Sequence, residues 1–340
     1  MPMTTLEATA RALVAPGKGI LAADESRGTI GKRFAAVGVA STDETRRQYR
    51  QMLFTTPGIA EFISGVILFD ETIRQKAKDG TLLVKVIEAA GTLPGIKVDK
   101  GVKPLPFCPG EVITEGLDGL GERLAEYRGL GAKFAKWRAV IDIGPGIPSY
   151  ACVNANTHAL ARYAALCQDE NIVPIVEPEV LMDGDHDIDR CAEVTEFVLK
   201  TVYEQLYYAR VKLEGTVLKP NMVVPGKKSA KQASVAEVAE KTVRVLKECV
   251  PAAVPGIAFL SGGQADVDAT ARLDAMNKIG GLPWRMSFSY SRALQAAPQK
   301  AWAGKPENVP AAQAAFAHRA RMNGLASLGQ WKPELEQAAA

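Results

Sequence analysis

The sequence predicts an α/β fold, a single-domain (β/α)8 or TIM barrel, from three observations. Short apolar runs that end in a polar residue or glycine recur eight times, and segments with helical spacing lie between most of them. No low-complexity linker or run of like charges divides the 340 residues. Alternating strands and helices are typical of parallel βαβ units, and eight units fit one closed barrel.

The eight runs are the expected strands of the barrel. They are GILAAD (19–24), GVILFD (65–70), IKVD (96–99), FAKWR (134–138), IVPIVEPE (172–179), TVLKPN (216–221), GIAFLSGG (256–263) and MSFSYS (286–291). Successive polar ends lie 30 to 46 residues apart, which is enough for a helical crossover. Helices are expected at residues 44–55, 157–169, 187–209, 234–250 and 265–278.

An open, doubly wound sheet is the alternative to a barrel. That fold would need a glycine-rich turn after the first strand, but the sequence there, ADESRGTIG (23–31), does not match G-x-G-x-x-G. We therefore expect one barrel domain over residues 1–340, with a short C-terminal tail from about residue 330.

Composition argues against several kinds of partner. The net charge of +3 comes from 41 basic and 38 acidic residues mixed along the chain, so we expect neither nucleic-acid nor membrane binding. The five cysteines form no Cys-x-x-Cys pair and the N-terminus has no signal-peptide core, so we expect a cytoplasmic protein. The three histidines lack metal-ligand spacing, so we expect no histidine-ligated metal.

Chemically active side chains gather at the expected strand ends, where barrel enzymes build their active sites. They are Asp24, Lys100, Lys136 with Arg138, Glu177 with Glu179, Lys219, Ser261, and Ser289 with Ser291. Because side chains alternate along a strand, the two members of each pair share a face. Several charges are therefore expected to point into one mouth of the barrel.

Lys219 lies in an apolar strand end, between Leu218 and Pro220. A buried ammonium is costly unless it is paired or neutral, so one interpretation is a structural ion pair with a carboxylate of a neighbouring strand. The other is a Schiff-base lysine, which must be neutral to attack although an unperturbed lysine titrates near about 10.4. Desolvation and a nearby cation, for which Lys136 is the candidate, favour the neutral amine.

Glu177 and Glu179 flank Pro178 and predict an acid/base pair. Neighbouring carboxylates can titrate apart, and a proton shuttle suits the gain and loss of water in imine chemistry. The alternative is an ion-pair partner for Lys136 or Lys219, and both interpretations can hold together.

The last two strand ends predict a phosphate site, because barrel enzymes commonly hold phosphate there with backbone amides. The residues are Ser261, Gly262 and Gly263 after the seventh run, and Ser289, Ser291 and Arg292 at the eighth. The guanidinium of Arg292 can add a bidentate contact.

Taken together, these residues resemble class I fructose-bisphosphate aldolases, the Schiff-base type. The likeness runs to about residue 329 and rests on many long motifs in one order. The motifs are GILAADES (19–26), GIKVDKG (95–101), FAKWR (134–138), IVPIVEPE (172–179), DGDHD (183–187), EGTVLKPNMV (214–223), FLSGGQ (259–264) and FSYSRALQ (288–295).

The resemblance implies reversible cleavage of fructose 1,6-bisphosphate to dihydroxyacetone phosphate and glyceraldehyde 3-phosphate, in glycolysis and gluconeogenesis, without a cofactor. Lys219 would form the iminium with C2 of the ketose. Glu177, supported by Glu179, would shuttle protons. Asp24 would accept the proton of the C4 hydroxyl, and Lys136 would set the local electric field.

The resemblance also implies two phosphate sites and a homotetramer. The C1 phosphate would be bound by the Ser261-Gly262 backbone, Ser289 and Arg292, and Arg138 would lie near Lys136. The opposite phosphate would lie against Ser26, Thr29, Lys32, Arg33 and Lys100.

Three departures from the family pattern stand out. The chain reads ADESRGT where the family usually reads ADESTGS, so Arg27 adds a cation beside the cleft. It reads FSYSR for FSYGR, so Ser291 replaces a glycine that allows close approach of the backbone to phosphate. The chain ends in PELEQAAA. Animal members of the family end instead in a tyrosine that assists proton exchange on the enamine.

Two other functions stay open at this point. One is another Schiff-base sugar-phosphate aldolase or a transaldolase, and the other is a barrel without catalytic activity that serves as a scaffold. The joint presence of Lys219, Glu177, Asp24 and Lys136 favours an enzyme.

Overall fold

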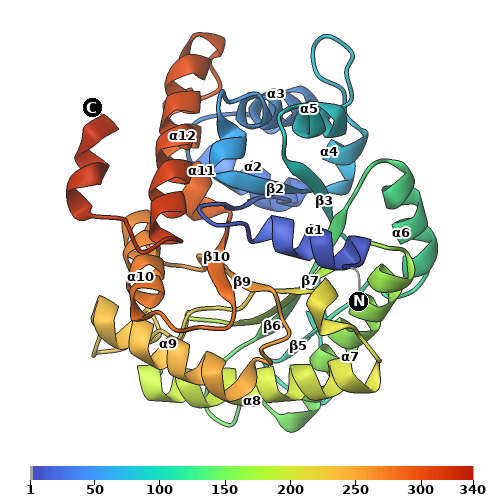
Figure 1. The fold of residues 1–340 in the computed structure, drawn as a ribbon, viewed down its shortest axis with the longest axis vertical. Coiled ribbons are helices and arrows are strands. Elements are labelled where there is room, and N and C mark those ends of the chain that lie inside the picture. Colours follow the sequence, from blue (N-terminus) through green and yellow to red (C-terminus); the bar gives the residue numbers. More distant parts are fainter. Residues whose placement is uncertain (1–2, 340) are drawn as a thin grey trace.

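A computed structural model of the chain describes residues 3–339 as a closed barrel of eight parallel strands with helices around it (Figure 1). The strands follow one another around the barrel in the order β1-β10-β9-β8-β7-β6-β3-β2. Their bounds are β1 Gly19–Ala23, β2 Ile63–Leu68, β3 Leu93–Lys97, β6 Phe134–Ile141, β7 Val173–Val180, β8 Val217–Leu218, β9 Gly256–Phe259 and β10 Arg285–Tyr290. Each of the eight predicted runs forms one of these strands, which confirms the barrel.

The five helices expected from the sequence are all present, and others join them. The α-helices are α1 Thr5–Leu13, α2 Arg27–Ala35, α3 Asp43–Phe54, α4 Asp70–Arg74, α5 Leu83–Ala89, α6 Leu120–Gly129, α7 Tyr150–Asp169, α8 Ile188–Tyr208, α9 Val235–Cys249, α10 Asp266–Ile279, α11 Arg292–Trp302 and α12 Val309–Ala326. The largest difference from the expected bounds is at α7, which begins seven residues before the expected 157, where the cap Ser149 accepts a hydrogen bond from the backbone N–H of Cys152.

Short elements complete the chain. One-turn 3-10 helices lie at Ile59–Glu61, Leu213–Gly215 and Pro306–Asn308, and a longer one at Pro333–Ala339. A small antiparallel pair, β4 Val102–Pro104 and β5 Val112–Thr114, follows β3 and was not expected from the sequence. The last 3-10 helix is held to α12 by an ion pair between Glu336 and Arg319 at 2.6 Å.

The interior of the barrel changes character along its axis. Its lower half is apolar and joins the start of the chain, because α1 packs across the N-terminal ends of the strands (Figure 1). The members of this inner core are Ala10, Leu13, Val14, Ile20, Ala22, Ile67, Phe134, Val173, Ile175, Val217 and Ala258. A larger core lies outside the strands, between them and the helices. The charged side chains that point into the barrel lie in the C-terminal half of the interior.

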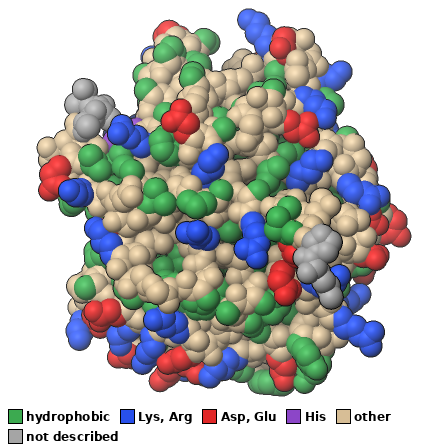
Figure 2. All heavy atoms as spheres, in the orientation of Figure 1, with side chains coloured by type: hydrophobic (Ala, Val, Ile, Leu, Met, Phe, Trp, Pro, Cys, Tyr) green, Lys and Arg blue, Asp and Glu red, His purple; other side chains and the backbone are tan. Residues whose placement is uncertain are grey.

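The outer surface carries both signs of charge, interspersed over the face seen in Figure 2. Within residues 3–339, no helix is long and apolar enough to span a membrane. No cluster of three histidine, cysteine or acidic side chains in that same part of the chain is arranged to hold a metal ion.

The inner core is closely packed, and a substitution at one glycine, Gly95, tests this packing. A Cβ atom on Gly95 of β3 would lie 2.3 Å from the ring of Phe134 on the next strand. We expect Gly95→Ala to lower the free energy of unfolding by about 1 to 3 kcal/mol, because overpacking forces side chains or backbone to move. Urea denaturation followed by circular dichroism measures the change.

Gly129→Ala is the matched control. Gly129 is the last residue of α6, and a Cβ atom there would meet no atom within 4 Å. Alanine at this position should leave stability unchanged or raise it by up to about 1 kcal/mol. A Gly95→Ala protein as stable as the Gly129→Ala protein would contradict the packing of Phe134 against β3.

Candidate active site

A cavity of about 680 Å³ opens at the C-terminal ends of the barrel strands. Fifteen of the residues predicted as functional line it, namely Asp24, Ser26, Thr29, Lys32, Arg33, Lys136, Arg138, Glu177, Glu179, Lys219, Ser261, Gly262, Ser289, Ser291 and Arg292. The structure thus brings together side chains from strands that lie far apart in the sequence.

Two of the predicted residues, Lys100 and Gly263, do not line the cavity. β3 ends at Lys97, so the side chains that enter the mouth after it are Lys97 and Asp99, and Lys100 is exposed. Because side chains alternate along a strand, residues 95, 97 and 99 of GIKVD share a face. That face would have been recognised as the inward one if Lys97 had been taken as the end of the strand. The Nζ atom of Lys97 lies 2.9 Å from Asp99.

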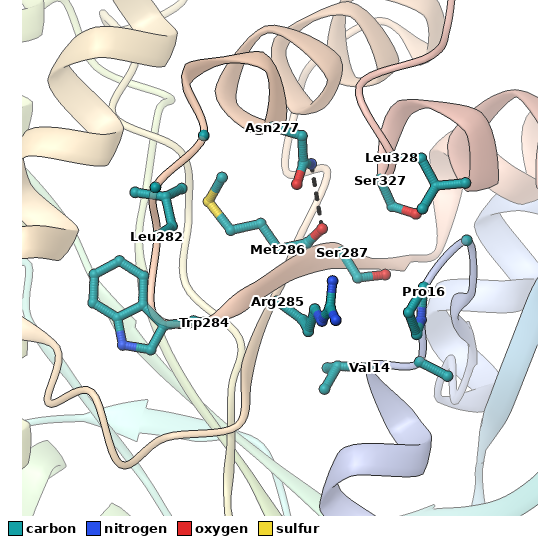
Figure 3. A pocket seen from close by; sticks show the side chains of 14 residues that line it. Val14, Pro16, Asn277, Leu282, Trp284, Arg285, Met286, Ser287, Ser327 and Leu328 are labelled. Carbon is teal, nitrogen blue, oxygen red and sulfur yellow. Dashed lines mark hydrogen bonds between the residues drawn. The ribbon is translucent and has the colours of Figure 1, made fainter.

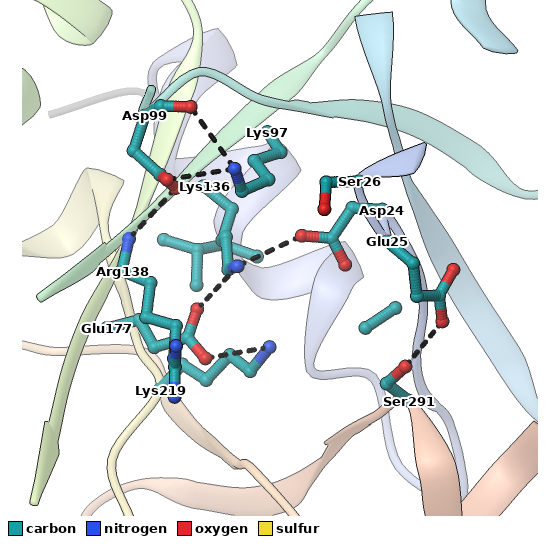
Figure 4. A network of polar contacts seen from close by, with 12 residues as sticks. Asp24, Glu25, Ser26, Lys97, Asp99, Lys136, Arg138, Glu177, Lys219 and Ser291 are labelled. Carbon is teal, nitrogen blue, oxygen red and sulfur yellow. Dashed lines mark hydrogen bonds and ion pairs between the residues drawn. The ribbon is translucent and has the colours of Figure 1, made fainter. Parts of the chain in front are cut away.

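Lys136 occupies the centre of the site (Figure 4). It lies on β6 and is 4% exposed. Its Nζ donates a hydrogen bond to Oδ2 of Asp24 at 2.9 Å and lies 3.1 Å from Oε2 of Glu177. Burial by itself would lower the pKa of Lys136, but the two carboxylates raise it above its ordinary value. Lys136 is therefore a fixed cation at ordinary pH.

Asp24 is the first residue after β1, and it is ionised in this setting. Burial by itself would raise the pKa of Asp24. The positive charges of Lys136 and Lys219 lower it by more than burial raises it, so the pKa lies well below the ordinary value. Asp24 is therefore a permanent anion at neutral pH and a potential proton acceptor.

Lys219 follows directly after the two-residue strand β8 and is 4% exposed. Its backbone N–H donates to the carbonyl of Val176 at 2.8 Å, which keeps the residue in register with β7. Its Nζ lies 3.2 Å from Oε1 of Glu177. The ion pair considered from the sequence is therefore present, and it places a carboxylate within proton-transfer distance of the amine, so the two interpretations of Lys219 agree with one geometry.

Glu177 is shared between the two lysines (Figure 4). It is 3% exposed, and its Oε2 makes no hydrogen bond to a residue of the described chain, since the contact with Lys136 lacks hydrogen-bond geometry. This oxygen is itself buried, and the ammonium of Lys136 lies beside it. Glu179, two residues on, accepts a hydrogen bond from Nε of Arg138 and holds that guanidinium at the rim.

The ends of β9 and β10 form one polar cradle. Gly262 has a φ of +54°, a conformation that favours glycine, and Nη2 of Arg292 donates to its carbonyl. The hydroxyl of Ser289 is buried in the cavity wall and has no partner within residues 3–339. An unpartnered donor beside a cation and backbone amides is suited to an oxyanion such as phosphate.

Helix α2 forms the opposite rim. Ser26 caps the helix, with its hydroxyl accepting from the backbone N–H of Thr29 at 3.3 Å. Lys32 and Arg33 follow one turn later, and Arg33 pairs with Glu25 at 2.6 Å. Two cations and two hydroxyls thus face the first cradle across the cavity.

A smaller cavity, of about 180 Å³, lies at the other end of the barrel, beside the start of β10 (Figure 3). Arg285 and Trp284 line it together with the segment after α1. Its described lining holds no lysine, histidine, cysteine or carboxylate, so it offers no general base to activate the hydroxyls of Ser287 and Ser327. The functional residues predicted from the sequence gather instead at the larger cavity.

Comparison with known proteins identifies the family. The family model "Fructose-bisphosphate aldolase class-I" matches residues 5–340. A probable fructose-bisphosphate aldolase class 1 of Xanthomonas campestris pv. campestris is 58% identical over 98% of this chain and 100% of its own. A fructose-bisphosphate aldolase of Echinococcus multilocularis is 55% identical over 99% of this chain and 93% of its own.

A solved structure agrees with these relatives. Fructose-bisphosphate aldolase from Plasmodium falciparum, crystallised with TRAP and a small-molecule inhibitor, superposes with a TM-score of 0.96 at 47% identity and covers 96% of this chain and 95% of its own. A whole-chain family match, relatives above half identity and the same closed barrel all agree. The chain belongs to the class I fructose-bisphosphate aldolase family.

Proposed function

We propose that Lys219 forms the Schiff base through which this class I aldolase cleaves fructose 1,6-bisphosphate to dihydroxyacetone phosphate and glyceraldehyde 3-phosphate. One observation carries the assignment: the buried amine lies 3.2 Å from Glu177, which also touches the cation of Lys136. A nucleophilic amine needs a base within reach to take its proton, and Glu177 lies at that distance.

Glu177 handles the proton in iminium formation. It takes a proton from the ammonium of Lys219, and the neutral amine adds to C2 of the ketose. A second proton moves from the nitrogen to the C2 oxygen to give a carbinolamine, and the protonated Glu177 then gives its proton to that hydroxyl, which leaves as water. The balance closes, because one water leaves and the positive charge ends on the iminium. Hydrolysis of the iminium runs the same steps backwards.

Asp24 takes the proton in the cleavage step. As it accepts the proton of the C4 hydroxyl, the electron pair of the C3–C4 bond moves into the iminium, which becomes a neutral enamine. The ammonium groups that keep Asp24 ionised also weaken it as a base. Loss of the iminium charge removes one of these cations, so Asp24 gains basicity as the bond breaks.

Two phosphate sites on opposite rims fit a substrate with a phosphate at each end. We assign the C1 phosphate to the cradle at β9 and β10 and the C6 phosphate to the rim at α2. Lys97 adds a cation to the mouth in the part of the site that the sequence assigned to Lys100.

Reductive trapping tests the Schiff base. Sodium borohydride added with dihydroxyacetone phosphate should reduce the iminium to a stable secondary amine, and peptide mass analysis should find the adduct on Lys219. Lys219→Arg should form no adduct and should lose cleavage. EDTA should leave the activity of the wild-type protein intact.

Lys227→Arg is the matched control, because Lys227 lies on the loop after β8, outside the cavity lining, and pairs with Asp183 at 2.6 Å. It should keep both the adduct and the activity. An adduct on a different lysine, or activity abolished by EDTA, would contradict the mechanism.

Asp24→Asn separates the two chemical steps. We expect kcat for cleavage to fall by about 10²- to 10⁴-fold, the usual contribution of a positioned base. Iminium formation depends on Glu177, so borohydride should still trap dihydroxyacetone phosphate on Lys219. Steady-state kinetics and the trapping assay measure the two effects. Loss of the adduct in a folded Asp24→Asn protein would assign Asp24 to iminium formation instead.

We further propose a cytoplasmic homotetramer. Relatives from Arabidopsis thaliana, 53% identical, and Spinacia oleracea, 54% identical, are named cytosolic and cytoplasmic aldolases. Sedimentation equilibrium should give four times the chain mass of 36.4 kDa. A mass of one or two chains at micromolar concentration would overturn the assembly.

A further inference from the structure

Ser291 departs from the family pattern, and the structure gives its side chain a specific role. It is the residue between β10 and α11, with φ −102° and ψ −79°, so its backbone does not need glycine. It occupies the N-cap position of α11, yet its side chain makes no cap hydrogen bond. Serine at this position usually accepts from the first turn of the helix, as Ser26 does at α2. The hydroxyl of Ser291 is used elsewhere.

The hydroxyl of Ser291 lies among three partners, and its one hydrogen is committed to Glu25. It donates to Oε1 of Glu25 at 2.6 Å (Figure 4), and it accepts from Nη1 of Arg33 at 2.9 Å and from Nε2 of Gln295 at 3.3 Å. Nε2 of Gln295 has two hydrogens and two nearer acceptors, the carbonyl of Ala22 and Oε1 of Glu25, both at 2.7 Å, so its contact with Ser291 is the weakest of its three. A ligand of a phosphate oxygen must donate a hydrogen, and the one hydrogen of the Ser291 hydroxyl already goes to Glu25. The side chain is a structural link and does not serve as a direct phosphate ligand.

Glu25 is the buried centre of this link. It is 6% exposed, and its Oε1 also accepts from Nη1 of Arg33 at 2.6 Å and from Nε2 of Gln295 at 2.7 Å. Arg50 lies 3.6 Å from its other oxygen. Because Arg50 and Glu25 are both buried, their positions are fixed, and Ser291 joins a rigid group.

Arg33 is the member of the group that faces the cavity. Its side chain is 25% exposed, and only its Nη1 is hydrogen-bonded to the described chain, through Glu25 and Ser291. Its remaining N–H groups are available to a ligand. The link therefore ties a cation of the α2 rim to the end of β10, across 258 residues of sequence.

We propose that Ser291 is a positioning residue that holds the Arg33 guanidinium for the C6 phosphate and so favours sugars phosphorylated at both ends. The proposal rests on the proposed assignment of the α2 rim to that phosphate. An arginine that is already fixed loses less conformational entropy when it binds the phosphate. Removal of the link weakens binding of ground state and transition state equally, which raises KM and leaves kcat in place.

Ser291→Ala removes the hydroxyl alone and tests the proposal against two substrates. The ratio of kcat/KM for fructose 1,6-bisphosphate to that for fructose 1-phosphate should fall by about three- to tenfold, the usual net effect of one hydrogen bond. The fall should come from KM of the bisphosphate. Ser291→Thr keeps the hydroxyl and should restore the ratio to within about twofold of the wild type.

Two controls separate positioning from structure. Ser234→Ala removes a serine that does cap its helix, accepting from Glu237 N–H at 3.1 Å, so it should lower Tm and leave the substrate ratio unchanged. In an Arg33→Ala background, Ser291→Ala should have no additional effect on the ratio, because the group it positions is gone.

Three outcomes would overturn the proposal. One is an unchanged ratio in Ser291→Ala, whether both substrates keep kcat/KM or lose it equally. The second is a further fall in the ratio when Ser291→Ala is added to Arg33→Ala, and the third is a fall in the ratio that comes from kcat of the bisphosphate and leaves its KM unchanged. Each is distinct from failure of the proposed function, in which the wild-type protein would give no borohydride adduct on Lys219 and would cleave neither sugar.

Discussion

Two lysines and two carboxylates are buried together at the mouth of the barrel, and their charges must cancel for the fold to hold them. Lys136, Lys219, Asp24 and Glu177 are each at most 8% exposed. Burial of one isolated charge in such a place would cost several kcal/mol of desolvation free energy. Each of the four charged groups is therefore stable there only while the neighbouring groups stay charged. Asp24 on the β1 side must reach Lys136 on β6, strands separated by β2 and β3, so the ion pair spans the interior of the closed barrel.

This balance gives the reaction its direction of charge flow. In the mechanism proposed for Lys219, its passage from ammonium to amine, or from iminium to enamine, removes one positive charge from the nitrogen and makes a nearby anion easier to protonate. Glu177 lies beside the nitrogen in the first case, and Asp24 shares the same field in the second. Lys136 does not change its charge at neutral pH, because both carboxylates raise its pKa. It keeps the site from becoming anionic while protons move.

The sequence predicted the parts of this arrangement that depend on local pattern. Apolar runs with polar ends marked all eight strands, and alternation within a strand placed Lys136 with Arg138 and Glu177 with Glu179 on inward faces. The same rule failed at β3, where the strand end was set at Lys100, three residues too late, so Lys97 was overlooked. The β4–β5 pair was missed as well, because two strands of three residues each carry too short a pattern to recognise.

Contacts between distant segments could not be predicted in the same way. The motif comparison drew attention to Ser291 because a glycine is usual there, and it suggested an effect on the approach of the backbone to phosphate. The backbone of Ser291 has a negative φ, which any residue adopts, so the substitution does not strain the chain. What the hydroxyl adds depends on Glu25, 266 residues away, and on a helix cap that it does not make. Closure of the barrel sets β1 beside β10 and brings these groups together, so the consequence of a single added oxygen follows from the topology of the whole chain.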